Sequence, residues 1–368
     1  MKKTNIAMIG VGCISGIYLE NITKLFTELT LLGVCDLVRE RAVAAQEKYG
    51  IPKLYETMAD AFADPQVDIV LNLTRPIEHY DVSMGALKAG KHVYSEKPLG
   101  ATLEEGIALK AMAAQNGLML GGAPDTFMGA GIQTCRKLID DGFIGTPVGC
   151  AAFMVCRGHE SWHPDPDFYY QLGGGPMMDM GPYYLTAMLN LMGGIQSVMS
   201  ASKISFPQRL ITSQPHAGDM INVTANTYVA GTLKFRSGAI GTLFTTFDVH
   251  YPSQARFEVY GSEGTLYVPD PNTFGGPIRL FRPEQKELCD MPLLFDYAPN
   301  SRGLGLADMA KAVATHRPAR ADCTQTFHVL DAITGFDRSA ESGQWVEMST
   351  AYQREAPMQK AKLLGVLD

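Results

Sequence analysis

The sequence predicts an α/β protein in two parts: an N-terminal doubly wound parallel sheet, and a C-terminal α+β domain on a large, mainly antiparallel, open sheet. Three observations predict this. Short apolar runs alternate with helical patterns through residue 122, a glycine-rich loop follows the first run, and strand-like segments dominate afterwards. The 368 residues suffice for two cores at about 150 residues per domain, so we expect domains at 1–122 and 123–368.

Strands and helices alternate in the first part. The expected strands are Asn5–Ile9, Leu31–Cys35, Ile69–Leu73, His92–Ser95 and Leu118–Gly121. The first three are almost continuously apolar, as in strands that are buried on both faces. The expected helices between them are Ile14–Lys24, Arg39–Tyr49, Ile77–Ala89 and Leu103–Asn116. Thr102 is placed to cap the last helix, whose first turn carries Glu104 and Glu105, where the helix dipole favours negative charge.

After residue 123 the regular alternation of strands and helices ends. Expected helices are Ala130–Asp141, Asp179–Leu191, Leu304–Ala314 and Thr324–Ser339, and the glycine-rich loop 173–175 leads into the second of them. Expected strands are Val148–Cys156, Val198–Ile204, Asn222–Val229, Thr232–Arg236, Ile240–Phe247, Arg256–Tyr260 and Thr265–Val268. Turn residues at 236–238 and 261–264 predict two hairpins. Antiparallel pairing of such strands gives the open sheet.

Composition excludes several classes of protein. The formal net charge is −7 and no block of Lys or Arg occurs, which disfavours binding to nucleic acid or to an anionic membrane. No apolar run reaches the roughly 18 residues of a transmembrane helix. The apolar run after Met1-Lys2-Lys3 is about five residues long, too short for a signal peptide. Seven cysteines without a C-x-x-C pair suggest reduced thiols, so we expect a cytoplasmic protein.

The loop Gly10-Val11-Gly12-Cys13-Ile14-Ser15 lies between the first strand and the first helix. At this junction Gly10 permits a tight turn, and Gly12 lets a pyrophosphate approach the backbone at the helix N-terminus. Ser15 takes the third glycine's place and is still small. This is the pattern of a Rossmann dinucleotide-binding fold, with cofactor contacts expected from Gly10, Gly12, Cys13, Ile14 and Ser15. A tight turn without a ligand is the alternative.

Asp36 ends the second expected strand, where a carboxylate accepts hydrogen bonds from the adenosine ribose of NAD. The same carboxylate would repel a 2′-phosphate, and no basic clamp precedes Arg39. The sequence therefore predicts NAD rather than NADP. A solvated aspartate at a strand end is the alternative interpretation.

Glu96-Lys97-Pro98 follows the fourth expected strand. After this dinucleotide loop, that tripeptide resembles the Gfo/Idh/MocA family over essentially the whole chain. The resemblance implies that Glu96 and Lys97 lie at the nicotinamide, and that Lys97 bonds the substrate oxygen. The stretch 74–79 resembles the family's turn after the preceding strand, which implies cofactor contacts from Thr74, Pro76 and His79. Pro76 replaces the usual asparagine, and His79 could equally be a helix-start residue.

The segment 173–183 resembles the family's glycine-rich stretch followed by D-x-G-x-H, with Tyr183 in place of the histidine. Hydride removal from an alcohol requires a base, and Lys and Tyr need tuning because their ordinary pKa values are about 10. The resemblance therefore implies Lys97, Tyr183 and Asp179 as catalytic residues. Asp179 would orient a partner, and either Lys97 or Tyr183 would carry the proton.

His159-Glu160-Ser161-Trp162-His163 matches the zinc-protease motif H-E-x-x-H, which works only on a helix. Gly158 precedes it and Pro164 follows it, so we expect a loop without a metal. A loop with His159, Trp162 and His163 suits a polyhydroxylated ligand, because hydroxyls need donors and acceptors and a sugar face stacks on indole. Trp162 could equally be a packing anchor.

Expected substrate contacts are therefore Lys97, Asp125, His159, Trp162, His163, Asp179 and Tyr183. Asp125 stands where the family often has an arginine, which disfavours an obligatory carboxylate on the substrate. The sequence predicts an NAD-dependent dehydrogenase that oxidises a secondary alcohol of a sugar, anhydrosugar or cyclic polyol. The resemblance implies a homodimer or homotetramer. The alternatives are a non-catalytic NAD-binding regulator, an NAD-dependent glycosidase and a zinc hydrolase.

Overall fold

The computed structural model describes residues 3–250, 256–361 and 363–368, so Met1 and Lys2 lie outside it. The chain forms two compact units. The first unit comprises Met1–Gly129, Phe295–Phe327 and Ala356–Asp368, and the second comprises Ala130–Leu294 and His328–Glu355. The boundary predicted between 122 and 123 lies near the first crossing. Two later segments also belong to the first unit, so the predicted division at one boundary is incomplete.

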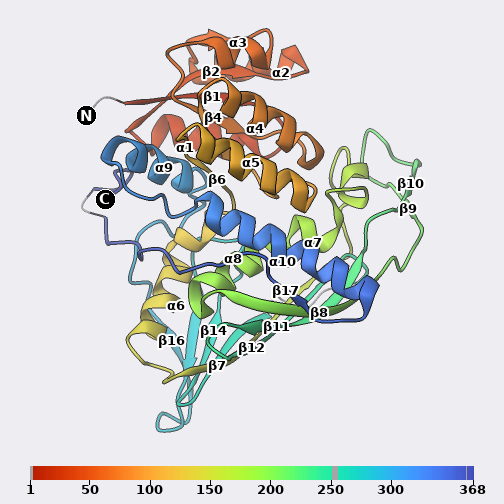
Figure 1. The fold of residues 1–368 in the computed structure, drawn as a ribbon, viewed down its shortest axis with the longest axis vertical. Helices are drawn as coiled ribbons and strands as arrows, with labels where there is room; N and C mark the ends of the chain where they lie inside the picture. The colour runs from red at the N-terminus through yellow and green to blue at the C-terminus, as the bar shows by residue number, and fades with distance from the viewer. Residues whose placement is uncertain (1–2, 251–255, 362) are drawn as a thin grey trace. The chain divides into compact units, whose positions relative to one another are not determined.

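Within the described residues, the first unit contains a six-stranded parallel sheet in the order β3-β2-β1-β4-β5-β6 (Figure 1). Its strands are β1 (Thr4–Ile9), β2 (Leu29–Cys35), β3 (Lys53–Leu54), β4 (Ile69–Asn72), β5 (His92–Ser95) and β6 (Leu120–Gly122). This confirms the predicted parallel sheet. Strand order reverses at β1, between β2 and β4, and ligands of such sheets bind at that point, beyond the carboxyl ends of the strands.

The helices of the first unit connect these strands. They are α1 (Ser15–Lys24), α2 (Arg39–Tyr49), α3 (Met58–Ala63), α4 (His79–Lys88), α5 (Leu103–Gln115) and α9 (Leu304–Thr315). The predicted cap of α5 is confirmed, since the Thr102 hydroxyl accepts a hydrogen bond from the Glu105 amide at 3.2 Å. The sequence analysis missed β3 and α3, because two and six residues are too few for a periodic signal.

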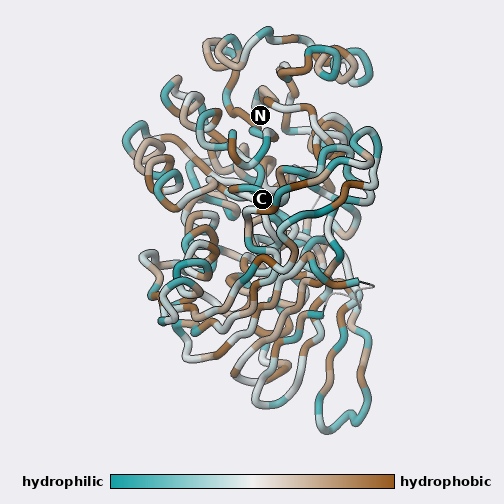
Figure 2. Tube along the Cα trace, turned by 90° about the vertical axis from the view of Figure 1, so that its right-hand side faces the viewer, coloured by the Kyte–Doolittle hydropathy of each residue, from teal (hydrophilic) through white to brown (hydrophobic). Residues whose placement is uncertain are grey.

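The second unit is built on a mixed sheet, nine-stranded within the described ranges, in the order β16-β15-β14-β13-β7-β12-β11-β8-β17. Its strands are β7 (Pro147–Val155), β8 (Ile195–Lys203), β11 (Tyr228–Phe235), β12 (Ile240–Thr246), β13 (Arg256–Gly261), β14 (Thr265–Val268), β15 (Ile278–Phe281), β16 (Leu288–Met291) and β17 (Val346–Glu347). β7 and β12 are parallel, and the other described pairs are antiparallel. Along β12 buried residues alternate with more exposed ones, as in a strand with one covered face. Figure 2 shows the hydropathy of each residue along the chain.

Two strand predictions in this unit are wrong. The stretch 222–229 is divided between β10 (Met220–Asn222), which pairs with β9 (Gln208–Leu210), and the start of β11. Between them the chain leaves the sheet, and the amides of Thr224 and Ala225 donate to the Tyr170 carbonyl. The stretch 232–236 is not a separate strand, because β11 continues through Gly231. A Cβ there would meet the Phe336 ring at 2.4 Å, so this glycine permits close packing rather than a turn.

The helices of the second unit are α6 (Ala130–Asp140), α7 (Gly175–Asp179), α8 (Gly181–Met192) and most of α10 (Cys323–Ser342), whose first turn belongs to the first unit. The predicted single helix at Asp179–Leu191 is therefore wrong in its start: α7 ends at Asp179, and α8 begins at Gly181. No helix in the described part of the chain is both long and apolar enough to cross a membrane.

Candidate active site

The glycine loop has the geometry that a pyrophosphate requires. Gly10 has φ 95°, and a Cβ there would lie 2.7 Å from the carbonyl oxygen of Leu73, so only glycine fits. A Cβ on Gly12 would meet nothing within 4 Å, which leaves open space above the backbone. The Ser15 hydroxyl donates to the Gly12 carbonyl at 2.7 Å and fixes the entry into α1. The loop therefore fits an anion at the N-terminus of α1.

The remaining loop positions, Cys13 and Ile14, precede α1 directly. Cys13 is exposed and Ile14 is half-buried. Asp36, at the end of β2, contacts the same loop: its Oδ2 accepts from the Val11 amide at 2.6 Å, and its Oδ1 accepts from the Val38 amide at 2.7 Å. Two backbone bonds hold the carboxylate at the loop, where it opposes a 2′-phosphate and fits NAD.

Asp36→Ala is expected to weaken NAD binding by on the order of 1.5–3 kcal/mol, the value of a hydrogen bond to a charged group, and to narrow the preference over NADP. Asp36→Asn keeps an oxygen that can accept from the Val11 amide but removes the negative charge. Comparing the two variants therefore shows whether the loss of affinity comes from the charge or from the lost support of the loop. Titrations of NAD and NADP followed by fluorescence measure both affinities. Unchanged affinities for both cofactors in Asp36→Ala would remove the ribose assignment.

His79 joins two turns at the carboxyl edge of the sheet. Its side chain is buried, with Nδ1 2.7 Å from the Pro98 carbonyl oxygen and Nε2 3.0 Å from the Thr74 carbonyl oxygen. Burial lowers the pKa of this imidazole, although both carbonyl bonds oppose the shift. Both ring nitrogens thus face backbone carbonyls rather than open space. His79 holds the turn after β4 to the turn that carries Lys97, and its predicted cofactor contact stays a prediction.

Thr74 and Pro76 remain partly accessible beside this histidine. The Thr74 hydroxyl donates to the Asn72 side chain at 2.7 Å, which fixes the turn at the end of β4. Pro76 begins a short 3-10 helix, Pro76–Glu78, ahead of α4. The structure does not test the predicted cofactor contacts of Thr74 and Pro76, so both contacts stay predictions.

Glu96 fixes the backbone at Lys97. Its Oε1 accepts from the Tyr18 hydroxyl at 2.7 Å, and its Oε2 accepts from the Lys97 amide at 3.1 Å. The Glu96 amide donates to the Asn72 carbonyl at 2.8 Å. These bonds hold the Lys97 backbone at the carboxyl end of β5, and the Lys97 residue is half-buried there. Glu96 acts through its neighbours, so the structure supports a positioning role for it.

Asp125 has a structural role that the sequence did not suggest. Its buried carboxylate accepts from the amides of Gly303 and Gly305 at 2.9 and 3.0 Å, at the start of α9. Burial raises the pKa of this carboxyl to about 6, against the effect of these two bonds and of Arg302. The Asp125 carboxylate thus holds the start of α9, and its predicted contact with substrate stays a prediction.

In the second unit, His159 lies in an aromatic cluster. Its ring stacks on Tyr169 at 3.8 Å between centroids and 7° between planes, and it meets Phe247 edge-on at 4.8 Å. The Trp162 ring lies 5.3 Å away, tilted by 46°. His159 Nε2 lies 3.4 Å from Asp179 Oδ2. The structure thus brings four predicted site residues together: His159, Trp162, Asp179 and His163, whose ring lies 5.4 Å from the Trp162 ring.

The H-E-x-x-H motif lies outside any helix, as predicted, and its members have partners of their own. Glu160 accepts from Arg209 at 2.6 Å and from the Tyr170 hydroxyl at 2.5 Å. Burial alone would raise the pKa of Glu160, but these bonds outweigh it and hold the pKa below its ordinary value. His163 Nδ1 accepts from the Asp165 amide at 3.0 Å. Over the described ranges, no three His, Cys, Asp or Glu side chains are placed to hold a metal ion.

A chelator is therefore expected to leave NAD reduction unchanged, and elemental analysis is expected to find no stoichiometric zinc. The reason is that the side chains of a zinc hydrolase site are bonded to protein groups here. Zinc bound at one ion per chain and lost in His159→Ala and His163→Ala would revive the hydrolase alternative.

Arg209 anchors this loop, and the sequence analysis missed it. Its side chain is only 1% exposed. It donates to the carboxylates of Glu160 and Asp248. It also donates to the Arg157 carbonyl at 2.9 Å and to the Phe247 carbonyl at 3.0 Å. Its two charged partners, Glu160 and Asp248, lie in segments far from Arg209 in the chain, so no local pattern predicted these bonds. The cluster holds the start of the loop against the end of β12.

Asp179 is the last residue of α7, and Tyr183 lies in the first turn of α8. Both are buried, with 9% and 6% exposure. They therefore lie on two helices, and not on the single helix expected at Asp179–Leu191. Their catalytic roles stay predictions.

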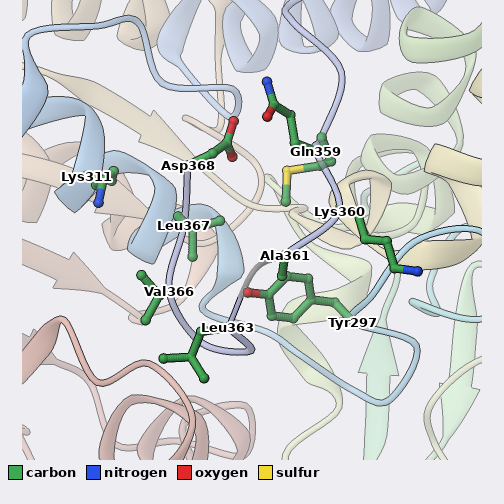
Figure 3. A pocket seen from close by; sticks show the side chains of 10 residues that line it. Tyr297, Lys311, Gln359, Lys360, Ala361, Leu363, Val366, Leu367 and Asp368 are labelled. Carbon is green, nitrogen blue, oxygen red and sulfur yellow. The ribbon is translucent and has the colours of Figure 1, made fainter.

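A cavity of about 280 Å³ lies elsewhere in the first unit (Figure 3). Tyr297, Lys311 and the C-terminal segment line it, and none of the predicted site residues does. We assign it no part in the site.

Two family models match the chain. Residues 4–122 match the model described as "Oxidoreductase family, NAD-binding Rossmann fold", and residues 132–267 match "GFO/IDH/MocA C-terminal domain". The two matches cover the glycine loop, Lys97, Asp179 and Tyr183.

Similar proteins include several dehydrogenases. Myo-inositol 2-dehydrogenase of Thermotoga maritima is 26% identical over 72% of this chain and 74% of its own. D-glucoside 3-dehydrogenase of Escherichia coli is 25% identical over 93% of this chain and 97% of its own. A levoglucosan dehydrogenase in complex with NADH and L-sorbose superimposes with a TM-score of 0.82 at 18% identity, covering 95% of this chain and all of the other. The last likeness shows the fold alone.

Proposed function

Because the chain belongs to the GFO/IDH/MocA family of oxidoreductases, with an NAD-binding Rossmann fold at its N-terminus, we propose that it oxidises a secondary alcohol of a sugar, anhydrosugar or cyclic polyol. One observation carries the proposal. The glycine loop, Asp36 and Lys97 follow β1, β2 and β5, so they lie at the carboxyl edge of one parallel sheet, where such folds bind their ligands.

The reaction breaks one C–H bond and one O–H bond of the alcohol and forms a carbonyl. NAD, when bound, accepts the hydride. The residues of this chain handle the proton and the developing charge. Lys97 and Tyr183 bond the reacting oxygen, and one of the two accepts its proton. Asp179, 3.4 Å from His159, orients its partners through its carboxylate.

The substrate class follows from the second unit as well. His159, Trp162 and His163 offer hydrogen-bonding nitrogens and aromatic faces in one loop, which suits a ring that carries many hydroxyls. The relatives named for inositol and glucoside substrates agree with this class.

We further propose that the protein works in the cytoplasm as a homodimer or homotetramer. All seven cysteines are free thiols, as expected in a reducing compartment.

The proposal is tested by a screen of NAD reduction across sugars, sugar lactones, anhydrosugars and inositols. Net NADH formation with at least one secondary alcohol is the expected result. Binding of NAD without turnover on any compound would favour the non-catalytic regulator. Cleavage of a glycosidic bond without net NADH would favour the NAD-dependent glycosidase.

A further inference from the structure

Asp36 and Glu56 follow two neighbouring strands of the first unit at matching positions. β3 pairs with β2 in parallel register, with Leu54 opposite Val34. The Tyr55 amide continues this pairing by donating to the Val34 carbonyl at 3.0 Å. The same register sets Glu56 opposite Asp36 beyond the ends of the two strands. Neighbouring strands lie about 4.8 Å apart, so both carboxylates belong to one short stretch of the sheet edge.

The charges at this edge are mainly negative. Burial raises the pKa of the Cys35 thiol, and the carboxylates of Asp36, Asp60 and Glu56 raise it further. All three carboxylates therefore lie near enough to the end of β2 to act on one buried thiol there. A 2′-phosphate on a ribose that Asp36 holds would meet these like charges, which disfavours NADP.

Arg39 is a cation at the same edge, and it is already paired. It is the first residue of α2, three positions after Asp36. Its Nη1 donates to Glu56 Oε2, and both side chains are largely exposed. In dinucleotide-binding folds an arginine near this strand end accommodates the 2′-phosphate of NADP. Arg39 has a suitable position in the chain for that role, but its guanidinium is bonded to the residue that follows β3.

The backbone around Glu56 is fixed by the start of α3. The next residue, Thr57, caps this helix, since its hydroxyl accepts from the Asp60 amide at 3.2 Å. In return, Asp60 Oδ2 accepts from the Thr57 amide at 2.9 Å. Glu56 therefore presents its carboxylate to Arg39 from a fixed point. An exposed ion pair of this kind contributes little to folding stability, so its removal should leave the fold intact.

We propose that Glu56 is a second determinant of cofactor choice, because it holds Arg39 away from the ribose and so masks a latent site for the 2′-phosphate of NADP. Asp36 excludes the phosphate by charge, and Glu56 also occupies the arginine that would bind it. This rests on the NAD site of the function proposed above and deepens it. When Glu56 loses its charge, the Arg39 guanidinium can donate to phosphate oxygens, which it matches in geometry.

Binding is measured first, without substrate, by calorimetric titration with NAD and with NADP at about 0.15 M salt. The readout is the ratio of the NADP affinity to the NAD affinity. Glu56→Gln should raise this ratio roughly tenfold, because the freed Arg39 gains a hydrogen bond to a charged group. Asp36→Asn combined with Glu56→Gln should raise it roughly a hundredfold, because a like charge is removed as well.

The gain should depend on Arg39. Arg39→Met should change the ratio little in the parent protein, where the guanidinium is paired, and should remove most of the gain in Glu56→Gln. The matched control is Glu47→Gln, which removes the same charge from an exposed position near the other end of α2 and should leave the ratio unchanged. Three results would each overturn the proposal: a parent-like ratio in Glu56→Gln, a gain that survives Arg39→Met, or an equal gain in Glu47→Gln.

Turnover is measured second, as kcat/KM with NADP relative to kcat/KM with NAD on the best compound of the screen, and should follow the binding ratio. A gain in NADP binding without reduction of either cofactor would support the role of Glu56 and remove the dehydrogenase function. NADH formation by the parent, with no gain in NADP binding in the Asp36→Asn and Glu56→Gln double variant, would keep the function and overturn the role of Glu56. A parent protein that binds neither cofactor would overturn both.

Discussion

Lys97→Met is expected to lower turnover by roughly 10²–10⁴-fold, the contribution of a general acid–base group, while the fold and NAD binding survive. Methionine keeps the bulk of the stem and removes only the ammonium. The donor of the bond to the Glu96 carboxylate is the Lys97 backbone amide, so this bond persists in the variant. The Asp36 and glycine-loop contacts lie on other strands, so cofactor binding does not depend on the ammonium.

Lys88→Met, at the exposed end of α4, is the matched control and should keep full turnover. NADH formation on the best compound of the screen gives the rate, and a fluorescence titration gives the NAD affinity. Near-normal turnover in Lys97→Met, with NAD affinity intact, would contradict the proposed mechanism.

Tyr183→Phe is expected to lower turnover to a similar degree, because it removes only the hydroxyl from a buried ring in the first turn of α8. Tyr184→Phe is the control: this neighbour is also buried, and its ring packs 6.5 Å from Phe257. The double variant Lys97→Met with Tyr183→Phe should lose less than the product of the two single losses, since residues that act on one proton form a unit. Fully multiplicative losses would mean that the two residues act in separate steps.

The first unit was predictable because its signals are local. Apolar runs such as Ile69–Leu73 are typical of buried parallel strands. A tight turn from a strand into a helix requires a residue with positive φ, and Gly10 is that residue here. The ends of the helices were less predictable. The helix expected from Ile77 begins at His79, because Pro76–Glu78 first forms a 3-10 turn.

The interactions that hold the site are non-local, and the sequence did not predict them. The cofactor contact of His79 was predicted from its position in a motif, and the motif did not show that the side chain is buried between the Pro98 and Thr74 carbonyls. Asp125 was assigned to the substrate, but its partners, Gly303 and Gly305, lie far along the chain.

The second unit shows the same limit in its strands. Gly231 looks like a break in an apolar run, and only the Phe336 ring packed against it explains why β11 continues. The pairing of β9 with β10 joins segments too short for a periodic pattern.

In the proposed reaction a hydride passes from a sugar carbon to NAD and stays there as net product. The most direct measurement uses a substrate from the screen with every ring carbon deuterated, so that the oxidised carbon need not be known. Mass spectrometry of the reduced cofactor then reports the transfer. We expect one deuterium in each NADH formed, in step with the ketone product, and almost no deuterated NADH from Lys97→Met. Reduced cofactor without deuterium, or bond cleavage without net reduced cofactor, would contradict it.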